Sequence, residues 1–479
     1  MTTTSQPAAG ARTCFDKMWD LHRIASFENN EDVLQVDRLL IHESMGAGVL
    51  RDLVAQQRAV QAPEQVFSFV DHAVDTEPAG RAKARGGWHE GATQLIEESV
   101  HMARRFGLHY IGADDARQGI VHVAAPELGV ALPGLTIACP DSHTCTLGGL
   151  GALAWGIGAS ECLHAVATQT LVLQRPGTMR VSLTGTLAAD VTAKDVMLHL
   201  IGLLGANAGV GYAVEFTGSV VRALPVEARM TLCNMAVEMS ARFGFVAADE
   251  LTFDYLRGRE YAPRGAQWDE AVRQWRALRT DDGAHFDREV EVDCTAIEPQ
   301  ITWGTSPQHA MPVSGRVPDP SQIIDVDERN WAERALRYQQ LTGGTEAQHI
   351  AIDAAYIGSC TNARLSDLRE AAHVLAGRKV APGVTAICVP GSSRVKAQAE
   401  SEGLDRIFRD AGFEWHDAGC GMCGNGRNRF KGERIVSTTN RNFENRQGLG
   451  SRTHLASPAT VAASAVAGRL VGARGMTKE

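Results

Sequence analysis

Gly134-Leu-Thr-Ile-Ala-Cys-Pro-Asp-Ser-His143 indicates the fold most clearly, because an apolar, β-rich run passes directly into a polar loop. Val384-Thr-Ala-Ile-Cys-Val-Pro390, followed by Gly-Ser-Ser, has the same order. Helical patterns alternate with such runs, as in Glu98 to Phe106 and Ala154 to Gln174. This alternation predicts an α/β protein with mostly parallel strands. Open α/β sheets bind ligands at the carboxyl ends of their strands, so we expect the functional side chains on these loops.

Length and composition are typical of a globular protein with several lobes. The chain has 479 residues, of which 44% are hydrophobic and 22% charged. Its net charge of −9 argues against a nucleic-acid binder, although a few arginines in one pocket can still bind a small anion. No apolar run reaches the roughly 18 to 20 residues of a membrane span. The polar segment Met1 to Arg12 lacks the features of a signal peptide, and we expect a cytoplasmic protein.

The alternation of strands and helices weakens in one region. Between about Glu298 and Glu346 prolines and glycines are frequent, and a fresh α/β unit begins near Ile350. We therefore predict N-terminal lobes over 1–300, formed by two intertwined α/β domains, a connector over 301–347, and a C-terminal α/β lobe over 348–479.

The ten cysteines are scattered along the chain, so a disulfide scaffold is not expected. A buried, inert thiol is the simplest interpretation for the isolated ones, which are Cys14, Cys139, Cys145, Cys162, Cys233, Cys294 and Cys388. Cys420-Gly-Met-Cys423 differs, because two thiolates three positions apart can converge on a metal, with a third supplied by Gly358-Ser-Cys-Thr-Asn362. Spacing alone leaves open an iron–sulfur cluster, a structural zinc without an evident fourth ligand, and a redox or structural pair.

Polar chemistry is carried by two further groups. Asp71-His72, His122 and Asp141-Ser-His143 set imidazoles beside carboxylates, which suits proton handling, although a histidine taken alone is more often structural. Asn440-Arg-Asn-Phe-Glu-Asn-Arg446 places two arginines five apart, a spacing that clamps carboxylates or forms a solvated basic loop. The glycine-dense run Gly148 to Gly158 lacks the phasing of a nucleotide loop, and close helix packing explains it better.

Together these segments resemble the aconitase superfamily. The segments in the superfamily's order are Asp141-Ser-His-Thr144, Gly148 to Glu161, Thr231-Leu-Cys-Asn-Met235, Gly358 to Asn362 and Asn440-Arg-Asn-Phe443. Within it the chain looks most like the isopropylmalate dehydratase large subunits, on the segments Ile41-His-Glu43, Gln118-Gly-Ile-Val-His122, Thr302-Trp-Gly-Thr305 and Arg441 to Gln447. The resemblance runs from about Leu39 to Val471 and implies an aconitase-like, three-lobed α/β/α architecture with mostly parallel sheets, lacking the swivelling fourth domain.

The resemblance also implies a cofactor and a site. A [4Fe-4S] cluster, one per subunit, is implied on Cys360, Cys420 and Cys423, with one iron open to substrate. A catalytic polar shell is implied at His42, Asp71, His72, His122, Asp141, His143 and Glu238. Contacts with substrate are implied for Ser142, Asn234, Asn440, Arg441 and Arg446.

The activity implied is a hydro-lyase that isomerises 2-isopropylmalate to 3-isopropylmalate by dehydration and rehydration, in leucine biosynthesis. Relatives carry the swivelling domain on a separate small subunit, so we expect this chain to need such a partner and to be inactive alone. A small dicarboxylate is the expected substrate, and neither nucleic acid nor a membrane is an expected partner.

Three positions depart from the dehydratase pattern. Ala73 stands where an Asn is common, Leu147 replaces a polar imidazole, and the loop from Gly424 to Phe430 looks shorter and more basic. These changes keep open a paralogue that acts on another 2-alkyl- or aryl-malate, or on an alkylmaleate, in secondary metabolism. Two rivals from other classes are a cluster-dependent regulator that binds RNA without iron and a zinc-stabilised binding module.

Overall fold

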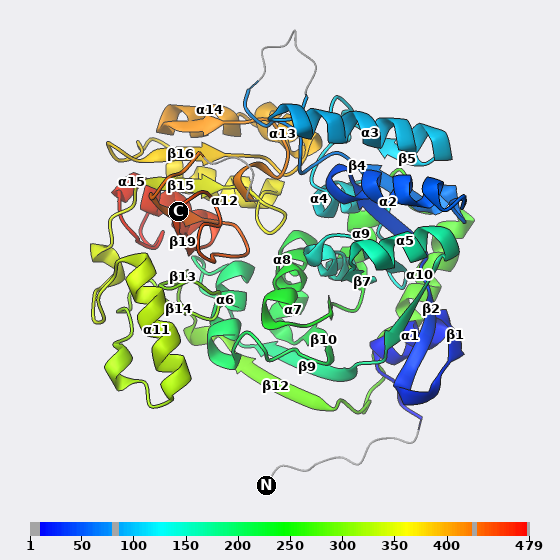
Figure 1. The fold of residues 1–479 in the computed structure, drawn as a ribbon. Helices are drawn as coiled ribbons and strands as arrows, with labels where there is room; N and C mark the ends of the chain where they lie inside the picture. Colours follow the sequence, from blue (N-terminus) through cyan, green and yellow to red (C-terminus); the bar gives the residue numbers. More distant parts are fainter. Residues whose placement is uncertain (1–9, 79–85, 424–428, 477–479) are drawn as a thin grey trace.

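The computed structural model describes residues 10–78, 86–423 and 429–476. Segments 1–9 and 424–428, which carry most of the polar N-terminus and of the basic loop after Cys423, lie outside the described residues. Within the described part, three parallel sheets organise the chain into three lobes (Figure 1). The predicted α/β class with mostly parallel strands is confirmed.

Each lobe is built on one parallel sheet. The first has the order β5-β4-β3-β6-β7, formed by β3 (Arg38–His42), β4 (Val66–Phe69), β5 (His109–Ile111), β6 (Thr136–Cys139) and β7 (Leu153–Gly156). The second has the order β11-β10-β9-β12, formed by β9 (Gly177–Thr184), β10 (Tyr212–Thr217), β11 (Phe243–Phe245) and β12 (Arg288–Asp293). The third has the order β17-β16-β15-β18-β19, formed by β15 (Ala354–Ile357), β16 (Thr385–Cys388), β17 (Phe413–Trp415), β18 (Arg434–Ser437) and β19 (Arg452–Leu455).

Small antiparallel sheets and helices complete the fold. The antiparallel strands are β1 (Arg23–Ser26), β2 (Glu31–Gln35) and β8 (Thr170–Gln174), and the pair β13 (Gln300–Thr302) and β14 (Ala310–Pro312). The helices are α1 (Cys14–His22), α2 (Glu43–Ala55), α3 (Glu90–Phe106), α4 (Val121–Leu128), α5 (Ala159–Thr168), α6 (Ala193–Leu204), α7 (Ser219–Ala223), α8 (Val226–Ala236), α9 (Glu250–Leu256), α10 (Ala266–Ala277), α11 (Val326–Gln339), α12 (Leu365–Leu375), α13 (Ser393–Ser401), α14 (Leu404–Ala411) and α15 (Pro458–Ala467). None of the described helices has the length and apolar character needed to cross a bilayer.

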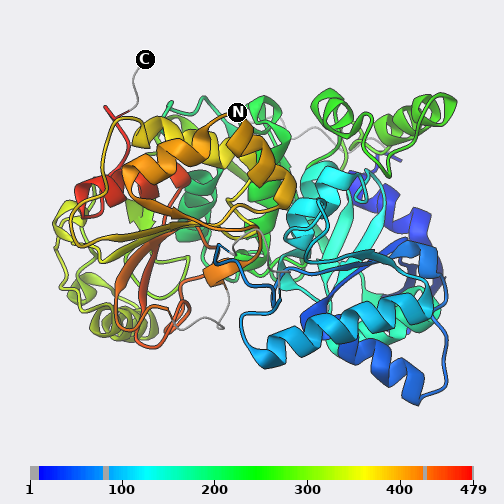
Figure 2. The ribbon, with the colours of Figure 1, turned by 90° about the horizontal axis from the view of Figure 1, so that it is seen from above.

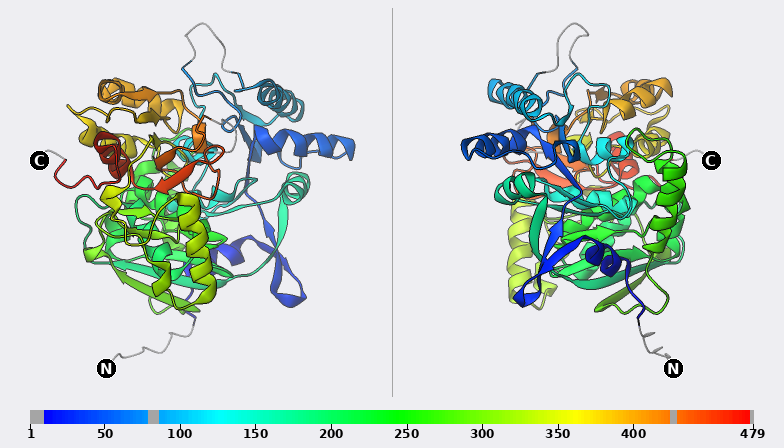
Figure 3. Two further views of the ribbon diagram at one scale, coloured as in Figure 1. Left: turned by 60° about the vertical axis from the view of Figure 1, so that its left-hand side comes forward. Right: turned by 90° about the vertical axis from the view of Figure 1, so that its right-hand side faces the viewer.

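The first and third lobes lie side by side, as the view from above shows (Figure 2). The second lobe, drawn mainly in green, lies beneath them (Figures 1 and 3). Helices α6 and α8 pack on the second sheet through a shared apolar core and stand between it and the upper lobes. Residues from all three lobes therefore meet near the middle of the molecule.

Two local predictions have different outcomes. The stretch Ala154 to Gln174 was predicted to be helical throughout, and this is wrong, because it holds the end of β7, then α5 and β8. In β8 Leu171 and Leu173 are buried while Val172 is exposed, the two-residue period of a strand. Gly148 and Gly149 do pack closely. A Cβ on Gly148 would clash with the backbone of β11, and a Cβ on Gly149 would clash with the backbone of α8 at Met230.

The segment 301–347 has secondary structure of its own. It contains β14 and α11, and it begins within β13. Trp303, Ala332 and Leu336 of this segment are buried in the core of the third lobe. The division of the chain into 1–300, 301–347 and 348–479 stays a prediction.

Candidate active site

The predicted site residues lie on loops that follow parallel strands and at nearby helix ends. His42 ends β3, Asp71 and His72 follow β4, Asp141 to His143 follow β6, Cys360 follows β15, and Asn440 and Arg441 follow β18. The other positions are His122 at the start of α4, Asn234 in α8, and Glu238 just after it. The first and third lobes touch here, because the Cys420 N–H donates to the Asp71 carbonyl at 3.1 Å.

Asp141 is the centre of a histidine–carboxylate network. Its Oδ1 accepts from the His143 N–H at 2.7 Å and lies 3.0 Å from His122 Nε2. Its Oδ2 lies 3.4 Å from His72 Nε2, and His72 Nδ1 lies 2.5 Å from Asp71 Oδ1. Burial opposes ionisation of Asp141, but the charges and hydrogen bonds of His122 and His72 hold its pKa well below the usual value. Asp141 is therefore a carboxylate.

His72 is held as an imidazolium, because both of its ring nitrogens face carboxylate oxygens. Burial lowers its pKa, but Asp71 and Asp141 outweigh burial and raise it well above the usual value. His42 stacks on this ring with centroids 4.3 Å apart, and its Nε2 donates to the Pro140 carbonyl at 3.0 Å. Nδ1 of His42 is buried and has no hydrogen-bond partner among the described residues. That nitrogen is available to a ligand.

Glu238 connects this network to the arginine loop, the segment from Asn440 to Arg446 that follows β18. Its Oε1 lies 2.7 Å from His143 Nε2 and 2.8 Å from Arg441 Nε. Arg441 Nη1 donates to the Ser142 hydroxyl at 3.1 Å. Burial disfavours the charged form of Glu238, but His143 and Arg441 lower its pKa. Arg441, whose side chain is 30% exposed, is thus held in place by one carboxylate and one hydroxyl.

The cysteine loops are shaped by their backbones. Ser359 has a φ of 89°, a left-handed conformation that is uncommon for a residue with a side chain. Gly421, between the paired cysteines, has a φ of 54°, and a Cβ there would lie 2.6 Å from the Tyr356 hydroxyl. Tyr356 accepts from the Met422 N–H at 3.1 Å and donates to the Cys420 carbonyl at 3.2 Å. The Tyr356 hydroxyl therefore fixes the turn that carries Cys420 and Cys423.

Side-chain N–H groups point at the cysteine sulfurs. Asn234 and Asn440 donate to Cys360 Sγ at 3.2 and 3.5 Å, and Arg446 donates to Cys423 Sγ at 3.4 Å. Donors of this kind accompany thiolates that ligate iron. Burial raises the pKa of Cys360 to about 12, so its thiolate needs a nearby positive charge such as a metal.

The donor set suits an iron–sulfur cluster better than a single zinc ion. A structural zinc site has four cysteine or histidine ligands, and sequence reasoning found no fourth one beside Cys360, Cys420 and Cys423. Three thiolates whose sulfurs accept side-chain N–H groups are the kind of set that holds an iron–sulfur cluster. Asn440 Oδ1 and Arg446 Nε, which lie on two of these donor side chains, have no partner among the described residues.

Every predicted site residue contacts at least one other residue of the predicted site, while the roles assigned to them stay predictions. The seven isolated cysteines are all buried, as expected. Sequence reasoning missed the supports. Glu43 accepts from the Asp71 N–H at 3.0 Å and also from the Ala73 N–H, and Arg364 donates to the Thr361 and Cys360 carbonyls at 2.8 Å. Glu43 does lie in the segment Ile41-His-Glu43, but nothing in its residue type shows that its carboxylate accepts from the backbone of another loop, and no segment singled out in the sequence contains Arg364.

Comparisons with known proteins identify the family of the chain. Residues 16–468 match the profile of the aconitase family (aconitate hydratase). A Bradyrhizobium diazoefficiens protein named 3-isopropylmalate dehydratase large subunit 1 is 51% identical over 469 residues, which cover 98% of this chain and 97% of that protein. The crystal structure of Thermococcus kodakaraensis aconitase X in its holo-form aligns over 85% of this chain and 84% of that one, at 15% identity and a TM-score of 0.45, too distant a likeness to carry an argument.

Proposed function

This chain belongs to the aconitase family, and we propose that it is the large subunit of a [4Fe-4S] hydro-lyase that isomerises 2-isopropylmalate to 3-isopropylmalate in leucine biosynthesis. The observation that carries the proposal is the meeting of three cysteines with an Asp–His–Arg shell at one place. The 51% identity to a named dehydratase large subunit supports the substrate. A cytoplasmic location of the protein stays a prediction.

Cys360, Cys420 and Cys423 would hold the cluster, and Asn234, Asn440 and Arg446 would donate to their sulfurs. When bound, the cluster supplies a Lewis-acidic iron that polarises the hydroxyl and a carboxylate of the substrate.

The chain's own residues bind the substrate and handle protons. Arg441 presents its guanidinium beside Ser142, where its fork suits a substrate carboxylate. His72 is about a third exposed, and its two ring protons face Asp71 at 2.5 Å and Asp141 at 3.4 Å, so the more loosely held proton on Nε2 is the one that would pass to a departing hydroxyl. Asp141 and Asp71 hold that ring in orientation, and Glu238 fixes His143.

A separate small subunit is the proposed partner. The relative's name, large subunit, implies such a protein. We expect it to complete the active site, so the cluster-loaded single chain should not turn over. Full turnover by the single chain would contradict the partner, though not the reaction class.

The first experiment tests the cofactor. Anaerobically purified chain should be brown, contain iron and labile sulfide, and lose both in Cys420→Ser. Cys294→Ser is the matched control, because Cys294 is also buried but isolated in the second lobe. A colourless, zinc-loaded protein would refute the cluster and with it the hydro-lyase.

The second experiment tests the substrate. The cluster-loaded chain is combined with a candidate small subunit and assayed against a panel of 2-alkylmalates. The proposal expects the highest kcat/KM for 2-isopropylmalate. A clear preference for another substituent would leave the reaction class standing and replace the substrate by that of a paralogue.

A further inference from the structure

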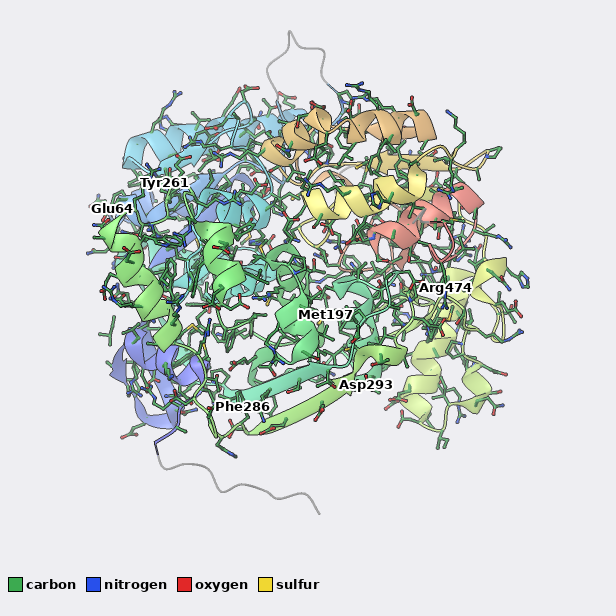
Figure 4. All side chains as sticks on the ribbon, turned by 180° about the vertical axis from the view of Figure 1, so that it is seen from behind. Glu64, Met197, Tyr261, Phe286, Asp293 and Arg474 are labelled. Carbon is green, nitrogen blue, oxygen red and sulfur yellow. The ribbon has the colours of Figure 1, made fainter. Side chains whose placement is uncertain are left out.

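Lys194 is a fully buried cation that the proposed chemistry does not use. Its exposed fraction is 0%, and it stands in the first turn of α6, the helix that runs through the middle of the molecule and carries Met197 in Figure 4. Its Nζ donates to the Thr439 carbonyl at 2.6 Å and the Thr438 carbonyl at 3.1 Å. No carboxylate pairs with this ammonium group in the part of the chain that the structure describes.

This placement is costly in two ways. A charge removed from water without a close counter-ion is strongly disfavoured. A cation in the first turn of a helix also faces the positive end of the helix dipole. Burial lowers the pKa of Lys194 to about 8, even though the negative charges of Glu238 and Asp195 oppose that shift.

The carboxylates that act on Lys194 from a distance have other partners. Asp195 caps α6 and accepts from the Gln300 N–H at 2.8 Å. Asp367 caps α12, and Glu238 is paired with Arg441. The described residues therefore supply no close compensation for the charge.

The two carbonyls that Lys194 holds come directly before Asn440, which donates to Cys360 Sγ, and Arg441. Cys423 is among the groups whose negative charge acts on Lys194. We infer that Lys194 is the buried counter-charge of the site: it balances the negative charge of the thiolate-bound cluster and of the dicarboxylate, while it positions the strand end before Asn440. This inference rests on the proposed cluster.

The test compares stability with and without the cluster. If Lys194 balances the site's negative charge, Lys194→Met should change the stability of the cluster-free chain little, because the removal of a costly buried charge offsets the loss of the hydrogen bonds to the Thr438 and Thr439 carbonyls. In the cluster-loaded chain the same change should lower the unfolding temperature, on the order of a few degrees. A residue that only pins carbonyls would destabilise both forms equally, or prevent folding of both, and either result overturns the inference.

Two further variants sharpen the comparison. Lys194→Arg keeps the charge, and the cavity of about 240 Å³ beside Lys194 offers room for the larger group, so the cluster should keep its redox midpoint potential. Lys194→Met should shift that potential, followed by electron paramagnetic resonance, to more negative values. Lys17→Met is the matched control, since Lys17 also donates to two carbonyls but pairs with Asp281.

The outcomes separate the two proposals. A wild-type chain that takes up no cluster refutes the proposed function itself. A wild-type chain that holds the cluster, together with an unchanged potential in Lys194→Met, refutes only the role of Lys194.

Discussion

Arg441→Lys removes the fork of the guanidinium while keeping its charge. Arg441 Nε contacts both oxygens of Glu238, at 2.8 and 3.1 Å, and Nη1 donates to Ser142 at 3.1 Å. A lysine ammonium can keep the contact with Glu238 or reach a substrate carboxylate, but it cannot serve both in the same geometry. A hydrogen bond to a charged group contributes about 1.5–3 kcal/mol, so kcat/KM should fall about 10- to 150-fold, mainly through KM.

The assay is steady-state turnover of 2-isopropylmalate by the cluster-loaded chain with its partner, followed by the ultraviolet absorbance of the unsaturated intermediate. Arg334→Lys is the matched control, because Arg334 pairs with Glu444 of the same loop at 3.2 Å but is 74% exposed. Such a surface pair contributes at most about 1 kcal/mol, and no substrate contact is lost. Wild-type kcat/KM in Arg441→Lys, or an equal loss in Arg334→Lys, would refute the carboxylate role.

Tyr338→Phe should raise KM several-fold while the iron content stays constant. The Tyr338 hydroxyl accepts from the Asn445 N–H at 2.7 Å and so holds the arginine loop in place. A lower unfolding temperature with an unchanged KM would contradict this prediction. Glu43→Gln should lower the free energy of unfolding in urea by about 1–3 kcal/mol, since either the Asp71 or the Ala73 N–H group loses its acceptor. An unchanged urea midpoint would refute this expectation. Burial opposes protonation of His22, but Asp37, 2.8 Å away, raises its pKa from 6.5. The stability that His22→Gln removes should thus be present below about pH 6.5 and be lost as pH rises through the raised pKa of His22. At the acid end it should also be lost as Asp37 becomes protonated, although the pKa of Asp37 is itself lowered from 3.8 despite burial. The test is the unfolding free energy of both proteins as a function of pH, and a difference that does not change with pH would show this prediction to be wrong.

The sequence predicts the class of the fold and the edge at which the site lies, because both follow from local patterns. An apolar run that ends in Pro140 and Asp141 has to be a buried strand with a polar loop at its carboxyl end. The limits of single elements were harder to predict. Ala154 to Gln174 contains enough alanine and leucine to suggest a helix, yet its ends are strands because of the sheets they join.

The residues that support the site could not be found in this way. Tyr338 and the loop it holds are about a hundred positions apart, and Lys194 reaches carbonyls of Thr438 and Thr439 across an even longer separation. Such residues bind backbone, which every sequence position offers. Only the folded chain shows which backbone they reach.

The position of the substitutions changes the argument about substrate. Ala73 and Leu147 replace polar residues of the dehydratase pattern, and on the sequence alone both keep open a paralogue with another substrate. In the structure Ala73 is 4% exposed among Val70 and Val74, and Leu147 is 0% exposed in the apolar core of the first lobe. Side chains enclosed by apolar neighbours change packing rather than contacts with a ligand. The case for a paralogue with another malate therefore rests on the segment 424–430 alone, and a chimaera that exchanges this segment with the Bradyrhizobium relative decides it. An altered order of 2-alkylmalates in the chimaera would establish the segment as the specificity element, and an unchanged order would remove the last sequence argument against 2-isopropylmalate.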